Sequence, residues 1–390
     1  MKKGRLRFHV DLGSPELGRL DIPVEVRQPN LIPAARGLSS QSIELDPGTY
    51  YVTARLPSGH ELFSQVLVEE DREVTVHLEA EPDEKETTPY DWRRKQVLYA
   101  KMAPTVRAVH AEAKLRIFTG NVLQDDYQTW APYFSPADWE RGKGRAHASL
   151  SGSNAPQYVQ LLQPYEPPLN VAFPAWVETG CQLVVTALPN RLTLDIQLQN
   201  PQAEMLLRYR ERGFLKEAAT VADSISPTAE DLLLHKGEDP IAATVGAYAL
   251  LHFGEMERLH GWTANLEEWF PWLPDGITVR AEHLARLGKH DEAFDTLLKL
   301  PSCGLPLFSE GLSYAIDRIR FYLKLEQDQF EEKLLAQARE LLQQLQRHAS
   351  FVDFAEPILT FTGLDPAAPD DRTLDEEDFV SAEGYSIELG

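Results

Sequence analysis

Apolar and polar side chains alternate over about the first eighty residues of the chain. The alternation is clearest in three runs, residues 5–10, 22–27 and 74–78. A period of two predicts β-strands that bury one face. Turn-forming sequences, among them Asp46-Pro47-Gly48 and the run 56–59, separate these strands. We therefore expect residues 1–80 to form a small antiparallel β-sandwich.

A second set of strand-like runs follows after an acidic stretch that contains prolines. That stretch includes residues 81–94, which we expect to be a linker because its composition does not support a buried core. The strand-like runs are residues 115–118, 158–162, 169–173, 182–186 and 192–198. They predict a second β-rich domain over residues 95–200.

From residue 201 to about residue 350 the apolar pattern becomes helical. Gly254 and Gly288 are 34 residues apart, which is the period of tetratricopeptide repeats. The run from Arg286 to Phe294 resembles the helix–glycine–helix corner of that family, whereas the spacing elsewhere is irregular. We therefore expect a multidomain α+β protein, with two β-sandwich-like domains followed by a domain of TPR-like α-helical hairpins.

The last forty residues are rich in acidic side chains. Between Asp365 and Gly390 there are nine Asp and Glu residues and one Arg. Self-repulsion and low apolar content predict that residues 351–390 form an acidic, flexible tail.

Composition limits the classes of partner. The chain of 390 residues has 38 Lys plus Arg against 60 Asp plus Glu, a net charge of −22. Nucleic acids and anionic membranes both attract basic surfaces, so we expect neither as a partner. The chain has no long apolar run, its first 23 residues lack the apolar segment of a signal peptide, and it has only two cysteines. A cytoplasmic protein is expected.

The sequence offers little local evidence of catalysis. It contains no HExxH, CxxC, GxSxG or phosphate-binding glycine loop. His252 and His260 lie on either side of Gly254, but without a third ligand at fixed spacing they are better explained as structural histidines than as a metal site. Cys181 begins a predicted strand and fits a small buried thiol better than a nucleophile. We expect a non-enzymatic protein without metal or cofactor. The alternative is a hydrolase-like enzyme whose site lies in the second β-domain or at its junction with the helices.

Three of the seven tryptophans lie close together, at Trp262, Trp269 and Trp272. Trp262 and Trp269 share one face of a predicted helix that Pro271 must end. The stretch fits an aromatic core seam between hairpins or a groove that binds a peptide. Because Trp272 lies beyond Pro271, it is the first choice for a partner contact, followed by the other two.

The N-terminal strands carry a familiar turn pattern. Leu45, Pro47, Gly48, Tyr50 and Val52, followed by Pro57 and Gly59, resemble the prealbumin-like β-sandwich modules of the carboxypeptidase-regulatory and PEGA type. This resemblance covers about eighty residues and implies a structural or adhesive module without catalytic residues.

A second resemblance covers residues 230–320. The runs 239–251, 258–265 and 269–276 are similar to a segment of uncharacterised bacterial proteins that accompany caspase-like or CHAT peptidases. It implies a partner, target or regulator of such a peptidase. We therefore expect an adaptor, inhibitor or proteolytic target in a bacterial signalling or defence system. The candidate cleavage sites are basic residues near the linker and in a Gly/Ser-rich loop: Arg94, Arg141, Lys143 and Arg145.

Overall fold

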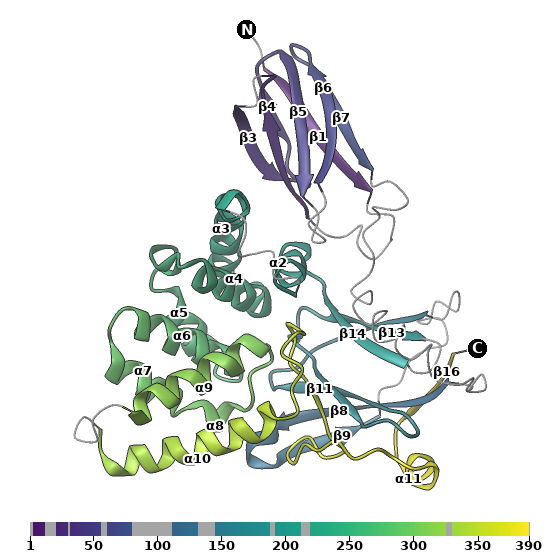
Figure 1. The fold of residues 1–390 in the computed structure, drawn as a ribbon, viewed down its shortest axis with the longest axis vertical. Helices are drawn as coiled ribbons and strands as arrows, with labels where there is room; N and C mark the ends of the chain where they lie inside the picture. The colour runs from purple at the N-terminus through teal and green to yellow at the C-terminus, as the bar shows by residue number, and fades with distance from the viewer. Residues whose placement is uncertain are drawn as a thin grey trace. The chain divides into compact units, whose positions relative to one another are not determined.

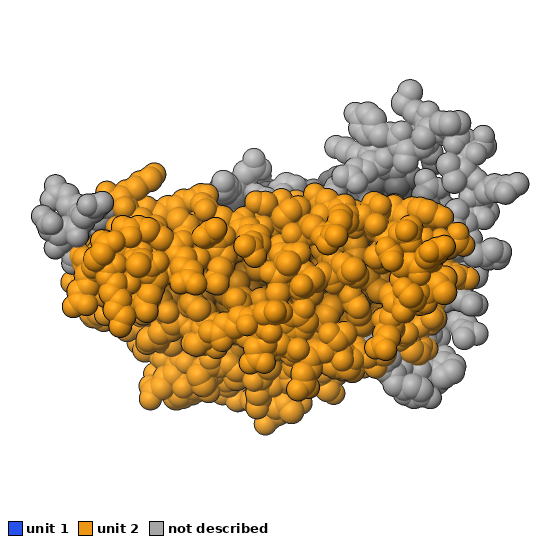
Figure 2. Space-filling view, turned by 90° about the horizontal axis from the view of Figure 1, so that it is seen from below, with its two compact units in different colours: residues 1–106, 200–228 blue, residues 107–199, 229–390 orange. Residues whose placement is uncertain are grey.

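The chain divides into two compact units. The computed structural model describes residues 3–11, 21–29, 32–55, 61–79, 111–131, 145–187, 192–211, 219–324 and 330–389. One unit comprises residues 1–106 and 200–228, and the other comprises residues 107–199 and 229–390. Figure 2 shows the described part of the second unit as one continuous body, coloured orange. The expected mixed α+β, multidomain architecture is confirmed, and the predicted linker, residues 81–94, lies outside the described residues.

The N-terminal strands form two sheets (Figure 1). The strands are β1 (Gly4–Asp11), β2 (Pro23–Arg27), β3 (Pro33–Leu38), β4 (Ile43–Leu45), β5 (Gly48–Arg55), β6 (Glu61–Val68) and β7 (Glu73–Glu79). One sheet has the order β4-β1-β7 and the other β3-β2-β5-β6. Alternate side chains such as Leu6, Val24, Val52 and Val76 are buried, as the period of two predicts.

The turn between β4 and β5 confirms the Asp46-Pro47-Gly48 signal. The hydroxyl of Tyr50 donates a hydrogen bond of 3.0 Å to the carbonyl oxygen of Asp46, which anchors the turn to the buried side of β5. The β1–β7 pair is parallel, while the other pairs in the two sheets are antiparallel. The sandwich is therefore not purely antiparallel, which corrects the sequence-based prediction.

The second β region contains two more sheets. Its strands are β8 (Ala111–Asn121), β9 (Asp126–Trp130), β10 (Arg145–Leu150), β11 (Gln157–Leu162), β12 (Leu169–Ala172), β13 (Cys181–Ala187) and β14 (Leu192–Leu198). The order β10-β13-β14 forms a three-stranded sheet. The larger sheet has the order β15-β12-β11-β8-β16, with β9 also paired to β8. Its two outer strands, β15 (Thr360–Thr362) and β16 (Tyr385–Leu389), come from the end of the chain.

The prediction of a flexible tail over residues 351–390 is wrong for the residues that the structure describes. β16 pairs with β8 in register over five residue pairs, and helix α11 (Glu376–Ser381) precedes it. Phe379 is only 4% exposed and packs with Leu162 and Leu374. The ammonium group of Lys114 donates to the carbonyl oxygens of Phe379, Val380 and Ala382 at the carboxyl end of α11. The second β region is thus completed by the C-terminal segment.

Helices occupy most of the chain between residues 201 and 349. They are α2 (Pro201–Glu211), α3 (Ala219–Leu234), α4 (Pro240–Phe253), α5 (Trp262–Trp269), α6 (Pro274–Arg286), α7 (His290–Leu297), α8 (Leu300–Cys303), α9 (Ser309–Lys324) and α10 (Glu332–Ala349), with the short 3-10 helix η5 (Met256–Leu259) after α4. The predicted corner is present, because α6 ends at Arg286 and α7 begins at His290. Gly288, between them, has a φ of 76°, a left-handed conformation that glycine adopts most easily. Gly254, after α4, has a φ of 77° for the same reason.

Candidate functional site

The three clustered tryptophans lie on α5 and just after it. Leu266, near the middle of α5, is fully buried, and the helix ends at Trp269 before Pro271, as predicted. Trp262 and Trp272 are half-buried, whereas Trp269 is 54% exposed. The ring that offers the most surface to a partner is therefore that of Trp269, and Trp272, the first choice from the sequence, offers less.

One lysine holds two of these indole rings. The Nζ atom of Lys236 lies 5.2 Å from the ring centroid of Trp262 and 5.2 Å from that of Trp269. Two indole faces attract a cation electrostatically, and the attraction grows when water is excluded. Lys236 is buried, and burial lowers the pKa of its ammonium group. Trp269 is therefore fixed on one side by Lys236 while much of its surface remains exposed.

Ion pairs lie beside Trp262, on the side of His260. The ring of His260 lies 4.3 Å from that of Trp262, and its Nε2 atom is 2.8 Å from Oε1 of Glu230. Arg258 also pairs with Glu230. The hydrogen bond from His260, together with Arg258, lowers the pKa of Glu230. His260 thus has a structural role between α3 and α5.

Further contacts fix α5 on the second unit. Oγ1 of Thr263 lies 2.9 Å from Nδ1 of His283, a buried histidine of α6. Phe270 packs edge-on against Trp176 from the second β region, with ring centroids 5.9 Å apart. The Nζ atom of Lys299 donates to Oε1 of Glu267 at 2.6 Å. These contacts hold α5 in place, so that Trp269 is presented on a rigid support.

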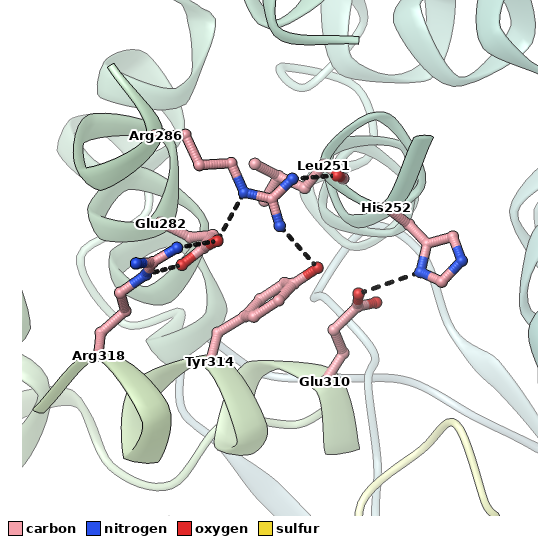
Figure 3. Close-up of polar contacts among 7 residues, drawn as sticks. All are labelled: Leu251, His252, Glu282, Arg286, Glu310, Tyr314 and Arg318. Atoms are coloured by element: carbon pink, nitrogen blue, oxygen red, sulfur yellow. Dashed lines mark hydrogen bonds and ion pairs between the residues drawn. The ribbon is translucent and has the colours of Figure 1, made fainter. Parts of the chain in front are cut away.

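A polar network joins α4, α6 and α9 (Figure 3). Glu282 of α6 is buried and accepts two hydrogen bonds from Arg318 of α9, of 2.5 and 2.8 Å. It also accepts one of 2.6 Å from Arg286, which in turn donates to the carbonyl oxygen of Leu251 on α4. The hydrogen bond with Glu282 raises the pKa of Arg318. A bidentate guanidinium–carboxylate pair of this kind fixes the relative rotation of two helices.

His252 lies at the other side of the same network. Its Nδ1 atom is 3.9 Å from Oε1 of Glu310, and Figure 3 shows both beside Tyr314. Burial raises the pKa of the Tyr314 hydroxyl. His252 and His260 therefore have different acidic neighbours, Glu310 and Glu230. Within the described ranges, no group of three His, Cys, Asp or Glu side chains could hold a metal ion.

The junction between the helices and the second β region contains a buried carboxylate. Asp275 is fully buried, accepts a hydrogen bond of 2.7 Å from the Tyr248 hydroxyl and another of 2.7 Å from the backbone N–H of Leu307. Burial raises its pKa to about 6. Gly311 of α9 packs so closely against Tyr248 that a Cβ atom added at Gly311 would lie 2.3 Å from the Tyr248 hydroxyl oxygen. Asp275 thus ties the segment before α9 to α6, and both of its oxygens accept hydrogen bonds from the protein.

The remaining predicted residues lie elsewhere. Arg145 begins β10 opposite Thr186, while Arg94, Arg141 and Lys143 lie outside the described residues. The thiol of Cys181 donates to the carbonyl oxygen of Pro174 at 3.0 Å, which agrees with a buried structural cysteine. In the part of the chain that the structure describes, no helix is long and apolar enough to cross a membrane.

Sequence reasoning missed Lys236, the Glu282 network and Asp275. Lys236 follows α3 and shows no local signal of its role. The indole rings that it contacts, those of Trp262 and Trp269, come 26 and 33 positions later in the sequence. Glu282 and Arg286 show a signal, because a Glu four residues before an Arg is a favourable helix pair. The partner on α9, Arg318, has no such local signal.

Part of the chain is similar to a described family. Residues 205–383 match the family of the Y4kD C-terminal domain. The match covers less than half of the chain. It contains α5, the network of Figure 3 and α11, and it does not extend to the N-terminal sandwich.

The chain is also similar to a curated protein described as a probable protease from a Desulfuromonadales bacterium. The two are 34% identical over 88 residues, which is 23% of this chain and 11% of that protein. The chain thus spans about a tenth of the length of the curated relative that it matches. The similarity is to a protein of that description, and the link of this chain with a peptidase stays a prediction.

Proposed function

We propose that this chain is a non-enzymatic protein-binding component of a bacterial peptidase-linked signalling or defence system. It would act there as an adaptor, inhibitor or proteolytic target, and its partner would be the peptidase. The single observation that carries this proposal is the position of Trp269, an indole ring that is 54% exposed and held by a buried lysine.

A fixed, exposed indole is suited to protein binding. Tryptophan is among the residues that contribute most to protein–protein interfaces. Because Lys236 and Trp262 already order the neighbourhood of Trp269, little conformational entropy remains to be lost on association. Trp272 and Trp262 lie within seven positions of Trp269 in the sequence and form the remainder of the proposed contact.

The choice of a peptidase as partner is supported by the sequence similarity. A stretch of 88 residues is 34% identical to part of a much longer protein described as a probable protease, which supports a module that works together with peptidases. The basic residues Arg141, Lys143, Arg145 and Arg94 stay our predicted cleavage sites if the peptidase has basic specificity. We also propose a cytoplasmic location, since both cysteines are thiols, as expected for a reducing compartment.

The N-terminal sandwich would be a structural or adhesive module in this system, in line with its prealbumin-like turn pattern. An enzymatic function has less support. Asp275, the carboxylate whose pKa is raised to about 6 at the junction, is fully buried and hydrogen-bonded to the protein by both oxygens, so it offers no atom to a substrate.

Capture from the native host tests the proposal. Tagged wild-type chain should recover a protein with peptidase activity, and the Trp269→Ala variant should recover much less of it. The matched control is Leu287→Ala, because Leu287 is 52% exposed at the end of α6. It is not one of the three rings, Trp262, Trp269 and Trp272, that form the tryptophan surface. Recovery of no peptidase, or equal recovery by Trp269→Ala and the control, would show that the proposal is wrong.

A further inference from the structure

In the described part of the N-terminal sandwich there are four edge strands, and three of them have features that prevent pairing with another chain. β3 begins with Pro33, and its pairing with β2 shifts register between Val26 and Arg27. β4 has only three residues. β7 alternates exposed polar side chains, Glu73, Thr75 and His77, along its outer side. Proline, irregular register, short length and charge are the usual devices that protect sheet edges.

Apart from the charge of Glu61 at its start, β6 has none of these devices. Its eight residues contain neither proline nor a basic side chain, and they pair with β5 without interruption from Glu61 to Val68. Among the described residues, β5 is the only strand that pairs with β6. Within the described ranges, the other edge of β6 therefore presents a row of backbone donors and acceptors that no other strand pairs with.

Two outward side chains of β6 are apolar, on either side of the exposed Gln65. Phe63 is 64% exposed and Leu67 is 57% exposed. Tyr51 on β5 lies beside Phe63, with ring centroids 5.4 Å apart, and extends the apolar surface. Leu62, Val66 and Val68 point into the core. An edge strand with a buried apolar face and exposed apolar side chains on its outer face is suited to joining another sheet.

We propose that β6 pairs with β6 of a second copy of this chain, antiparallel about a two-fold axis through Gln65. Opposite residues in an antiparallel pair share a face of the sheet, so the register must keep outward residues opposite outward residues. With the axis at Gln65, Phe63 of each copy lies opposite Leu67 of the other, and the two Gln65 amides face each other. The two four-stranded sheets become one continuous sheet.

Registers with the two-fold axis at a neighbouring residue give less favourable cross-strand pairs. An axis at Ser64 places Phe63 opposite Gln65 and Leu67 opposite Glu61. An axis at Val66 places Phe63 opposite Glu69. Apolar cross-strand pairs stabilise a sheet, and an apolar side chain opposite a carboxylate does not. The sequence of β6 thus favours self-pairing in one register, independently of the tryptophan surface.

Charge gives the dimer a characteristic salt dependence. The paired segment from Leu62 to Val68 contains no charged residue, while Glu61 of one copy lies opposite Glu69 of the other at both ends. The chain as a whole carries a net charge of −22. Because salt screens repulsion between like charges, the dimer should become stronger as the ionic strength rises.

Sedimentation velocity of the full chain over a concentration series tests the oligomeric state. Wild type should form a dimer, and the double variant Phe63→Lys/Leu67→Lys should weaken dimerisation at least about tenfold, because lysines on an edge prevent strand pairing. Both positions are exposed, so the fold of the monomer tolerates the change, which circular dichroism verifies. Thr75→Lys on the β7 edge is the matched control and should remain dimeric.

Cysteine cross-linking tests the register. In the Gln65→Cys variant, the two thiols meet at the axis and should form an intermolecular disulfide under mild oxidation, since opposite Cα atoms in an antiparallel pair lie within disulfide range. Leu67→Cys alone should not, because its neighbour across the axis is Phe63. A chain that stays monomeric up to about 100 µM, a dimer that survives the lysine variant, or faster cross-linking of Leu67→Cys than of Gln65→Cys would overturn the proposal. In the monomeric case, a strand of a different protein would be the remaining occupant.

Discussion

Two ionisable side chains, Asp275 and Lys236, are buried at positions that organise the helical region. Burial disfavours the charged form of both, which raises the pKa of Asp275 and lowers that of Lys236. The protein compensates each charge differently. Asp275 accepts a backbone N–H and a hydroxyl, whereas Lys236 faces two indole rings. The first arrangement holds α6 to the segment before α9, and the second positions Trp269.

The raised pKa of Asp275 predicts a pH-dependent contribution to stability. Its pKa is about 6 in the folded chain and about 3.9 in an unfolded one, so protonation favours the folded state. The stabilising contribution is therefore complete below about pH 4 and is lost as the pH rises through about 6. Two pKa units correspond to about 3 kcal/mol. The Asp275→Asn variant cannot titrate at this position.

Chemical denaturation of both proteins across this pH range measures the effect. We expect the free energy of unfolding of wild type, relative to Asp275→Asn, to decrease by about 2 kcal/mol from about pH 4 to about pH 7. A difference that is constant over this range would mean that Asp275 is not desolvated as the structure shows.

At the scale of elements, the sequence predicts those features that depend on residues close together in the chain. The alternation in β1, β2 and β7 predicted strands, and Asp46-Pro47-Gly48 predicted a turn, because both depend on neighbours in the sequence. The corner at Gly288 was predicted for the same reason. The parallel pairing of β1 with β7 was not, since it joins residues about seventy positions apart.

The corner between α6 and α7 gives a direct test of backbone conformation. Gly288 has a φ of 76°, and no atom lies within 4 Å of the position of an added Cβ, so a substitution there meets only backbone strain. Gly288→Ala should therefore reduce the free energy of unfolding by about 1 kcal/mol. Gly261 is the matched control, because its surroundings are equally open while its φ is −86°. Equal effects of the two alanine substitutions would contradict the left-handed assignment at Gly288.

The C-terminal segment shows where composition misleads. Its acidic run is favourable in the structure, because Asp375 caps α11 and Glu376, Glu377 and Asp378 occupy the first turn, where the helix dipole stabilises negative charge. The apolar residues that anchor the segment are few and widely spaced, and their partners belong to β8 and β11. A sequence window that is mostly acidic does not reveal such distant partners.

Phe379 is the residue that tests this correction. It is 4% exposed in the cluster with Leu162 and Leu374, so Phe379→Ala should cost about 3 kcal/mol through lost burial and the cavity that remains. The next residue, Val380, is 69% exposed, and Val380→Ala should change stability by less than about 0.5 kcal/mol. Thermal denaturation distinguishes the two. A Phe379→Ala melting temperature equal to that of the control would restore the flexible-tail interpretation.

At the scale of the whole molecule, the two proposed surfaces lie in different units. The β6 edge belongs to residues 1–106, and the tryptophan surface belongs to residues 229–390. Because each surface lies on a separately packed unit, its variants can be tested without disturbing the other. Loss of the dimer and loss of peptidase binding are thus separate observations.

The sequence indicated the tryptophan surface but not its arrangement. The spacing of Trp262 and Trp269 predicted that they share a helix face, and Pro271 predicted where α5 ends. Which ring remains exposed depends on Lys236, Thr263 and Phe270 and on what they contact in three dimensions. The sequence therefore predicted a partner contact within these eleven residues and preferred Trp272, whereas Trp269 is the most exposed of the three rings in the structure.

The affinity of the captured peptidase for purified wild-type and variant chains tests the central claim most directly. If Trp269 anchors the partner, Trp269→Ala should raise the dissociation constant at least about 30-fold, equivalent to about 2 kcal/mol, and by more than Trp272→Ala does. The melting temperature of Trp269→Ala should stay close to that of wild type, because the ring is largely exposed. A dissociation constant that changes less than about threefold, with the variant still folded, would contradict the account and move the partner surface away from α5.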